Sequence, residues 1–127
     1  MKKLKKIVSS EAWEQEKLFE WAKDNIKNHY ELWLLNASMN GFIPNKNLRF
    51  KAVKQGLKAG FPDINLPIAR QGFHALYIEM KRVDVCAIDK YQIPWHKLLR
   101  DEGNRVAVCS GWHEAKNVLI NYLTEIA

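Results

Sequence analysis

The strongest constraint on the fold is a predicted β-hairpin between residues 61 and 81. Its second half, 74–81 (HALYIEMK), has the clearest strand pattern in the chain, and residues 61–68 lead into a turn-like Arg70-Gln71-Gly72. If the hairpin folds about Gln71, position 63 lies opposite 79 and position 65 opposite 77. Because strand side chains alternate between two faces, one face becomes continuously apolar. That face consists of Ile64, Leu66, Ile68, Leu76, Ile78 and Met80.

The other face of the hairpin collects polar side chains. They are Asp63, Asn65, Tyr77, Glu79 and Lys81. Directly opposed residues have Cβ atoms roughly 4.5–5.5 Å apart, so Asp63 and Glu79 can hold one divalent cation between them, with Lys81 one pleat along. Without a cation the two carboxylates repel each other. On an exposed hairpin the same residues can also be ordinary solvated pairs.

The remaining patterns predict an α/β order, α-β-α-β-β-α-β-α. Ser9 or Ser10 is expected to cap the first helix, and Asp89 with Gln92 forms a capping-box pattern before a helix that stops at Gly103. The expected elements are a helix over about 11–28, a strand over 30–37, a short helix over 47–59, the hairpin, a helix between 89 and 103, a strand over 105–109, and a last helix opened by Ser110 or Gly111.

Size and charge limit the classes of protein that remain. With 127 residues, the chain is expected to be one domain (1–127) with a basic arm at 1–10, and it has no apolar run of membrane-spanning length. Twenty Lys and Arg oppose fourteen Asp and Glu, so the net charge of +6 favours a polyanionic partner such as nucleic acid. Five basic residues precede Gly60, either as phosphate contacts or as a solvated face. They are Lys46, Arg49, Lys51, Lys54 and Lys58.

Three motifs together carry a resemblance to a known family. They are Gly60-Phe61-Pro62-Asp63, Glu79-Met80-Lys81, and Gln92 followed by Trp95. The D…ExK pattern is weak alone, but with G-x-P-D before it, the glutamine helix after it and the αβββαβ order, the chain resembles a stand-alone VRR-NUC domain. That domain belongs to the PD-(D/E)xK nuclease superfamily, and the similarity runs over about 11–123.

The resemblance implies a restriction-endonuclease-like α/β fold, in which helices flank a central mixed sheet. It also implies an endonuclease that uses Mg²⁺ or Mn²⁺ to hydrolyse phosphodiester bonds in DNA. Asp63, Glu79 and the main-chain carbonyl of Met80 would be metal ligands, and Lys81 would be the catalytic lysine. The glutamate of the first helix would match Glu11, a further ligand, although Glu14 lies on the same side.

These residue types suit phosphodiester hydrolysis. A hard cation on carboxylates lowers the pKa of a bound water and polarises the phosphoryl oxygen, and magnesium needs only two or three protein ligands. Lys81 can orient the water or offset charge on the phosphate. Gln92 either supports Lys81 or the metal-bound water, or only completes the capping box. Whether one or two metals operate stays open. His96 is the one histidine expected to help near the site.

The resemblance also implies partners. Small free-standing members are typical of bacteriophages and are thought to act as homodimers on branched or otherwise structured DNA, here in the cytoplasm of the host. Two other functions stay open: a catalytically silent module that binds DNA junctions, and a nuclease subunit of a larger DNA-processing complex.

Overall fold

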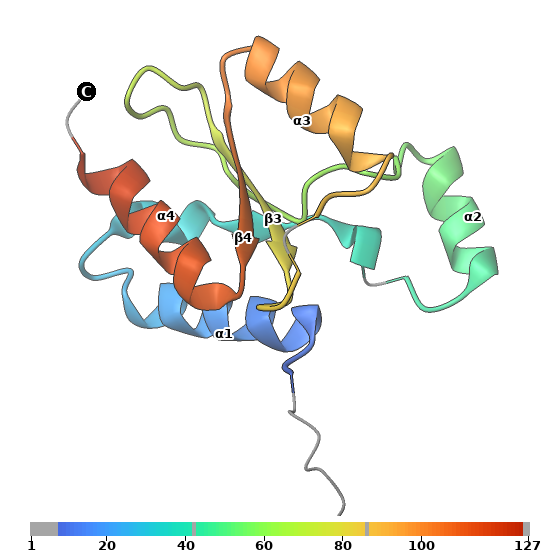
Figure 1. Ribbon diagram of the computed structural model, residues 1–127, viewed down its shortest axis with the longest axis horizontal. Coiled ribbons are helices and arrows are strands. Elements are labelled where there is room, and N and C mark those ends of the chain that lie inside the picture. Colours follow the sequence, from blue (N-terminus) through green and yellow to red (C-terminus); the bar gives the residue numbers. More distant parts are fainter. Residues whose placement is uncertain (1–7, 42, 86, 126–127) are drawn as a thin grey trace, which may run out of the picture.

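The computed structural model describes residues 8–41, 43–85 and 87–125, so the predicted basic arm lies mostly outside the described residues. The observed order agrees with the predicted one (Figure 1). Its main elements are α1 (Glu11–Asp24), β1 (Asn36–Ala37), α2 (Lys46–Lys54), β2 (Ile64–Leu66), β3 (Leu76–Lys81), α3 (Gln92–Asp101), β4 (Arg105–Ser110) and α4 (Trp112–Thr124). No helix in these ranges is long and apolar enough to cross a membrane.

The four strands form one mixed sheet in the order β1-β2-β3-β4. The β1–β2 and β2–β3 pairs are antiparallel, whereas β3 and β4 are parallel and are joined through α3. The hairpin register is the predicted one, because Ile64 pairs with Ile78 and Asn65 with Tyr77. The sheet and its flanking helices fit a restriction-endonuclease-like α/β fold, which confirms the predicted fold class.

The predicted apolar face of the hairpin forms the core. Helices α1 and α4 pack against each other and against β3, and their buried residues meet those of the sheet. The core includes Ile64, Leu66, Leu76, Ile78 and Met80 from the sheet, and Leu18, Ala22, Ala115, Leu119 and Tyr122 from the two helices. Helix α3 packs on β4 and turns polar side chains toward the opposite face of β3.

Helix ends follow their capping residues. Ser10 accepts the N–H of Trp13 at 3.1 Å and so starts α1, which ends at Asp24 rather than at the predicted Asn28. Asn45 caps α2 in the same way, so the helix starts at Lys46, one residue before the predicted start. Helix α2 ends at Lys54 and not near Gly60, because Gly56 turns the chain with a φ of 111°.

The predicted strand over 30–37 is wrong for its first part. Residues Tyr30–Leu34 form a 3₁₀ turn, and only Asn36–Ala37 pair as a strand. The two buried leucines fit a tight turn, because the N–H of Leu35, which caps it, donates to the carbonyl of Leu32, the i to i+3 bond of a 3₁₀ turn. A strand would have placed these two leucines on opposite faces.

The predicted ends of the α3 segment are confirmed. The carboxylate of Asp89 accepts the N–H of Gln92 at 3.1 Å, while Oε1 of Gln92 accepts the N–H of Asp89 at 3.0 Å. This reciprocal pair is a capping box, although regular helix begins only at Gln92. At the other end Gly103 has a φ of 89°, and the N–H of Asn104 donates to the carbonyl of Leu99, as in a Schellman motif.

Candidate active site

The two predicted metal-ligand carboxylates lie together at the end of the hairpin. Asp63 directly precedes β2 and Glu79 is in β3, and the observed register continues to place them opposite each other. Oδ2 of Asp63 accepts the N–H of Met80 at 2.8 Å. The N–H and C=O of a strand residue point to the same lateral side, so the carbonyl of Met80 also faces Asp63. The two carboxyl groups therefore lie together, with the main chain of Met80 beside Asp63.

Glu79 is held in an environment that disfavours its charge. Its side chain is only 2% exposed. Burial raises the pKa of Glu79 to about 10, and a hydrogen bond and charge repulsion from Asp63 act in the same direction, while Lys81 partly opposes them. In the absence of a cation Glu79 is therefore protonated at neutral pH. A divalent cation bound between the two carboxyl groups would replace this proton and offset the repulsion between their charges.

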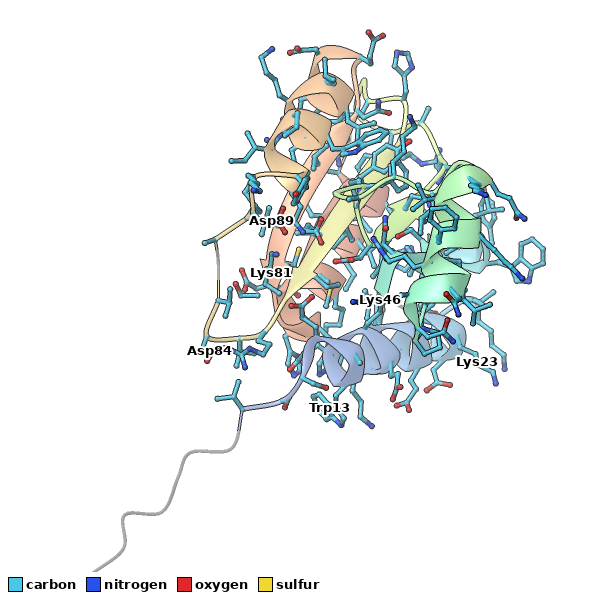
Figure 2. All side chains as sticks on the ribbon, turned by 90° about the vertical axis from the view of Figure 1, so that its right-hand side faces the viewer. Trp13, Lys23, Lys46, Lys81, Asp84 and Asp89 are labelled. Atoms are coloured by element: carbon cyan, nitrogen blue, oxygen red, sulfur yellow. The ribbon has the colours of Figure 1, made fainter. Side chains whose placement is uncertain are left out.

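Lys81 is fixed by the start of α3. Its Nζ donates to Oε1 of Gln92 at 3.1 Å, and its side chain is buried. The same oxygen accepts the N–H of Asp89, so Gln92 combines the two roles that the sequence left as alternatives. Figure 2 shows Lys81 near the end of β3, with Asp89 beside it. The arrangement holds an ammonium group on the carboxylate face of the sheet.

The two glutamates of α1 have different surroundings. Oε1 of the buried Glu14 accepts the N–H of Trp112 at 2.9 Å, so Glu14 caps the start of α4. Glu11 lies one turn earlier on the solvent side. Partial desolvation and the nearby charge of Asp63 raise the pKa of Glu11, whereas Lys81 and Arg82 lower it. The structure thus brings Glu11, not Glu14, into electrostatic reach of the site.

The residues present fit a hard divalent cation. Within the described ranges, no three His, Cys, Asp or Glu side chains are already grouped as a metal site. The donor set is instead two carboxylates and a main-chain carbonyl, and magnesium accepts such a set because it retains several waters. Oε1 of Glu79 has no hydrogen-bond partner, which leaves this buried acid incompletely satisfied. Glu11 as a further ligand stays a prediction.

The G-x-P-D motif has a structural explanation as well. A Cβ on Gly60 would lie 2.1 Å from the carbonyl oxygen of Tyr91, so only glycine allows this loop to approach the start of α3. The indole of Trp95 donates to the carbonyl of Ala59 at 3.1 Å, and its ring meets Phe61 edge to face. These contacts fix the distance between the segment that carries Asp63 and the helix that holds Lys81.

The basic segment before Gly60 projects from the body of the protein. Helix α2 stands apart from the sheet and buries none of its residues (Figure 1). Its side chains bond to one other described element, the 3₁₀ turn Met39–Gly41. Figure 2 views the molecule from this side, with Lys46 on α2. Arg49 donates to the carbonyl of Asn40, and Lys54 lies over the ring of Phe50. No ion pair with a described carboxylate neutralises α2 or Lys58.

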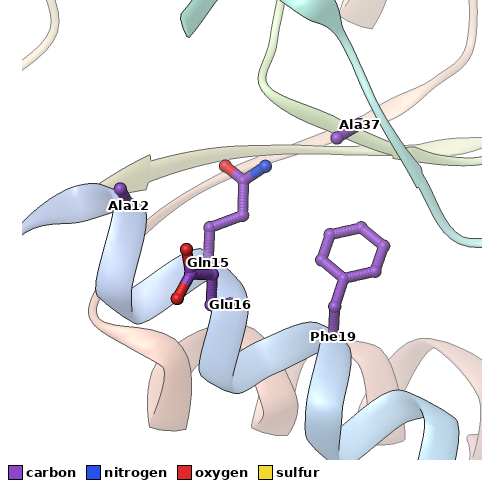
Figure 3. Close-up of a pocket in the computed structure, with 5 residues that line it drawn as sticks. All are labelled: Ala12, Gln15, Glu16, Phe19 and Ala37. Atoms are coloured by element: carbon purple, nitrogen blue, oxygen red, sulfur yellow. The ribbon is translucent and has the colours of Figure 1, made fainter. Parts of the chain in front are cut away.

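The hollow shown in Figure 3 does not contain the predicted chemistry. It has a volume of about 280 Å³ and lies between α1 and β1. Gln15 and Phe19 project from α1 toward the strand that carries Ala37. The lining is mainly apolar and contains none of the predicted ligands. We therefore locate the site by its carboxylates and lysine and not by the shape of the surface.

His96, the one histidine expected near the site, lies beside Glu79. It lies on α3 and is 1% exposed, and its Nε2 is 3.5 Å from Oε1 of Glu79. Burial, together with the charges of Arg100 and Lys81, lowers the pKa of His96, which favours the neutral imidazole. One signal was available: His96 follows Gln92 by four residues and so shares its helix face.

Comparison with known proteins gives a structural match. No family model matches the chain, and no curated protein matches it. A solved structure of a VRR_NUC domain protein, however, superimposes with a TM-score of 0.76 and 25% sequence identity, and the match covers 95% of each chain. This similarity suggests a nuclease-type domain. The resemblance found in the sequence motifs is thereby confirmed, and the chain shares the fold of that VRR_NUC domain protein.

Proposed function

We propose that this protein is a Mg²⁺- or Mn²⁺-dependent endonuclease that hydrolyses phosphodiester bonds in branched or otherwise structured DNA. The observation that carries the proposal is the carboxyl pair of half-buried Asp63 and buried Glu79, with the ammonium of Lys81 on the same face of the sheet. A cation bound there would supply an activated water and polarise the phosphoryl oxygen. A nuclease-type domain is what the similarity to a VRR_NUC structure suggests.

The protein's own groups have separate roles in this mechanism. Asp63, Glu79 and the Met80 carbonyl would hold the cation, and Glu11 would bind a further water or cation. Lys81 would hold the attacking water or offset the negative charge that grows on the phosphate. Gln92 keeps the ammonium of Lys81 from swinging away, because it anchors that group at 3.1 Å from a helix start.

The basic segment supplies a surface for the DNA backbone in this proposal. Its five cations are Lys46, Arg49, Lys51, Lys54 and Lys58. Helix α2 has nine residues, and a helix this short is unstable by itself. Its tie to another described element is the bond from Arg49 to Asn40. A polyanion would both neutralise and order the helix. A homodimer would present two such surfaces and two sites to a branched substrate, and a monomeric mass in light scattering at micromolar concentration would contradict this part of the proposal.

The test is cleavage of labelled linear, flap, splayed and four-way DNA in Mg²⁺ or Mn²⁺. Asp63→Ala, Glu79→Ala and Lys81→Ala should each abolish cleavage, and so should chelation of the metal. Matched controls are Asp101→Ala and Lys97→Ala, since these exposed residues pair with each other on the outer surface of α3. Cleavage that survives Asp63→Ala unchanged would refute the ligand assignment. Binding of DNA without any cleavage would favour the silent junction-binding module.

A further inference from the structure

Helix α3 turns two polar side chains, one helical turn apart, toward alternate residues of β3. Gln92 meets Lys81, and four residues later His96 meets Glu79. Residues separated by four positions lie on one helix face, and residues separated by two lie on one strand face. The register between α3 and β3 therefore matches both polar residues of the E-x-K motif with a partner from the same helix.

Polar atoms of His96 and Glu79 are buried at this contact without hydrogen bonds. Oε1 of Glu79 and both ring nitrogens of His96 are buried without a partner in hydrogen-bond geometry. Unsatisfied buried polar groups are destabilising, and native proteins rarely leave them so. The two side chains face each other at 3.5 Å, and a small rotation of the imidazole would join them. That bond would give Oε1 of Glu79 and Nε2 of His96 a partner.

We propose that His96 is a positioning residue, which donates its Nε2–H to Oε1 of Glu79 and thereby aims Oε2 at Asp63 and the cation. The proposal rests on the proposed metal-dependent function. A carboxylate has two oxygens, and free rotation would let either of them turn away from the site. With Oε1 engaged by a buried ring, only one orientation remains. Oε1 is an acceptor whether Glu79 is protonated on Oε2 or ionised, so the same bond persists before and after a cation binds.

Geometry decides which ring nitrogen the proposal needs as the donor, because Nε2 is the atom that lies 3.5 Å from Oε1 of Glu79. A neutral imidazole has only one N–H. The proposal places it on Nε2, the nitrogen that faces Glu79.

The experiment compares three substitutions and a control in the full chain. His96→Gln keeps an N–H at about the reach of Nε2, His96→Asn ends near the Nδ1 position, and His96→Leu has no polar group. His113→Leu is the matched control, because His113 is an exposed histidine on α4. The affinity for Mn²⁺ is measured by calorimetric titration without DNA, and circular dichroism checks that each variant is folded.

We expect His96→Leu and His96→Asn to bind Mn²⁺ about 10–100-fold more weakly than the wild type, as is typical when the partner of a metal ligand is lost. His96→Gln should retain most of the affinity, and His113→Leu should equal the wild type. A role in packing alone predicts the reverse order, with the apolar His96→Leu least affected. Equal affinity of folded His96→Leu and wild type would overturn the inference.

A second measurement does not depend on the metal. In long-range ¹H–¹⁵N NMR spectra of the metal-free protein, His96 should be a neutral Nε2–H tautomer. The Nδ1–H tautomer would overturn the inference while leaving the proposed nuclease intact. If the wild type binds no Mn²⁺ at all, the proposed function itself fails, so the two failures are distinguishable.

Discussion

Glu79→Gln should stabilise the metal-free protein, and increasingly so as the pH rises. The pKa of Glu79 is about 10 in the folded protein and 4.5 in its ordinary state. Between these values the folded state binds a proton that the unfolded state has lost, so the free energy of unfolding of the wild type falls with pH. The amide of glutamine resembles the protonated acid and does not titrate. The variant therefore escapes this loss.

The size of the effect follows from linkage. Each pH unit in this window costs the wild type up to about 1.4 kcal/mol relative to the variant. The difference in unfolding free energy should therefore grow by up to about 4 kcal/mol between pH 6 and pH 9. Burial of the side chain justifies a value near this limit, whereas water that reaches the carboxyl pair would reduce it.

The assay is urea unfolding in EDTA at pH 6, 7, 8 and 9, followed by the same series in Mg²⁺. In EDTA the variant should be the more stable protein. In Mg²⁺ the difference in unfolding free energy should shrink or change sign. Only the wild type gains stability from the cation, by about 2.7 kcal/mol when the cation is at 100 times its dissociation constant. Asp101→Asn, on the exposed surface of α3, is the control. A difference between wild type and variant that stays constant from pH 6 to 9 would refute the reasoning.

Three other outcomes are expected. Gly60→Ala should destabilise the fold by about 2–4 kcal/mol in urea unfolding, since strain at positive φ adds to a clash with the start of α3. Gly72→Ala is the control, because Gly72 has a positive φ but open space around it, and it should cost only about 1 kcal/mol. Equal costs for the two variants would contradict the close approach at Gly60. Glu14→Ala should lose about 1–3 kcal/mol because the buried N–H of Trp112 loses its acceptor, with Glu14→Gln retaining most of the stability in the same melts. Removal of three lysines from α2 should lower the slope of log affinity against log salt by up to about 3, in fluorescence anisotropy with a four-way junction. An unchanged slope would show that α2 does not contact phosphates. The three lysines are Lys46, Lys51 and Lys54.

The sequence predicted those parts of the fold that depend on neighbouring residues. The hairpin register was predictable because a slip of one residue would have exposed Ile64 and Ile78 together. The capping box of α3 lies within four residues and was equally readable. The 3₁₀ turn before β1 was not, because a short apolar stretch fits a strand or a turn until its tertiary contacts are known.

The candidate site divides in the same way. Asp63, Glu79 and Lys81 could be placed on one face by parity alone. The choice between Glu11 and Glu14 of α1 could not be predicted, since Glu14 accepts a hydrogen bond from the N–H of Trp112, a residue 98 positions away. The contact between His96 and Glu79 also depends on how α3 lies across the sheet, and no local pattern specifies that packing.

One oxygen atom of Gln92 links helix initiation to the readiness of the lysine. Oε1 of this residue accepts hydrogen bonds from both the N–H of Asp89 and the ammonium of Lys81. Fraying of the first turn of α3 would therefore also release the side chain of Lys81. Any process that unfolds this turn would switch off the proposed cleavage without displacing a metal ligand. A graft of the hairpin alone onto another scaffold would carry the acids but leave the lysine unanchored.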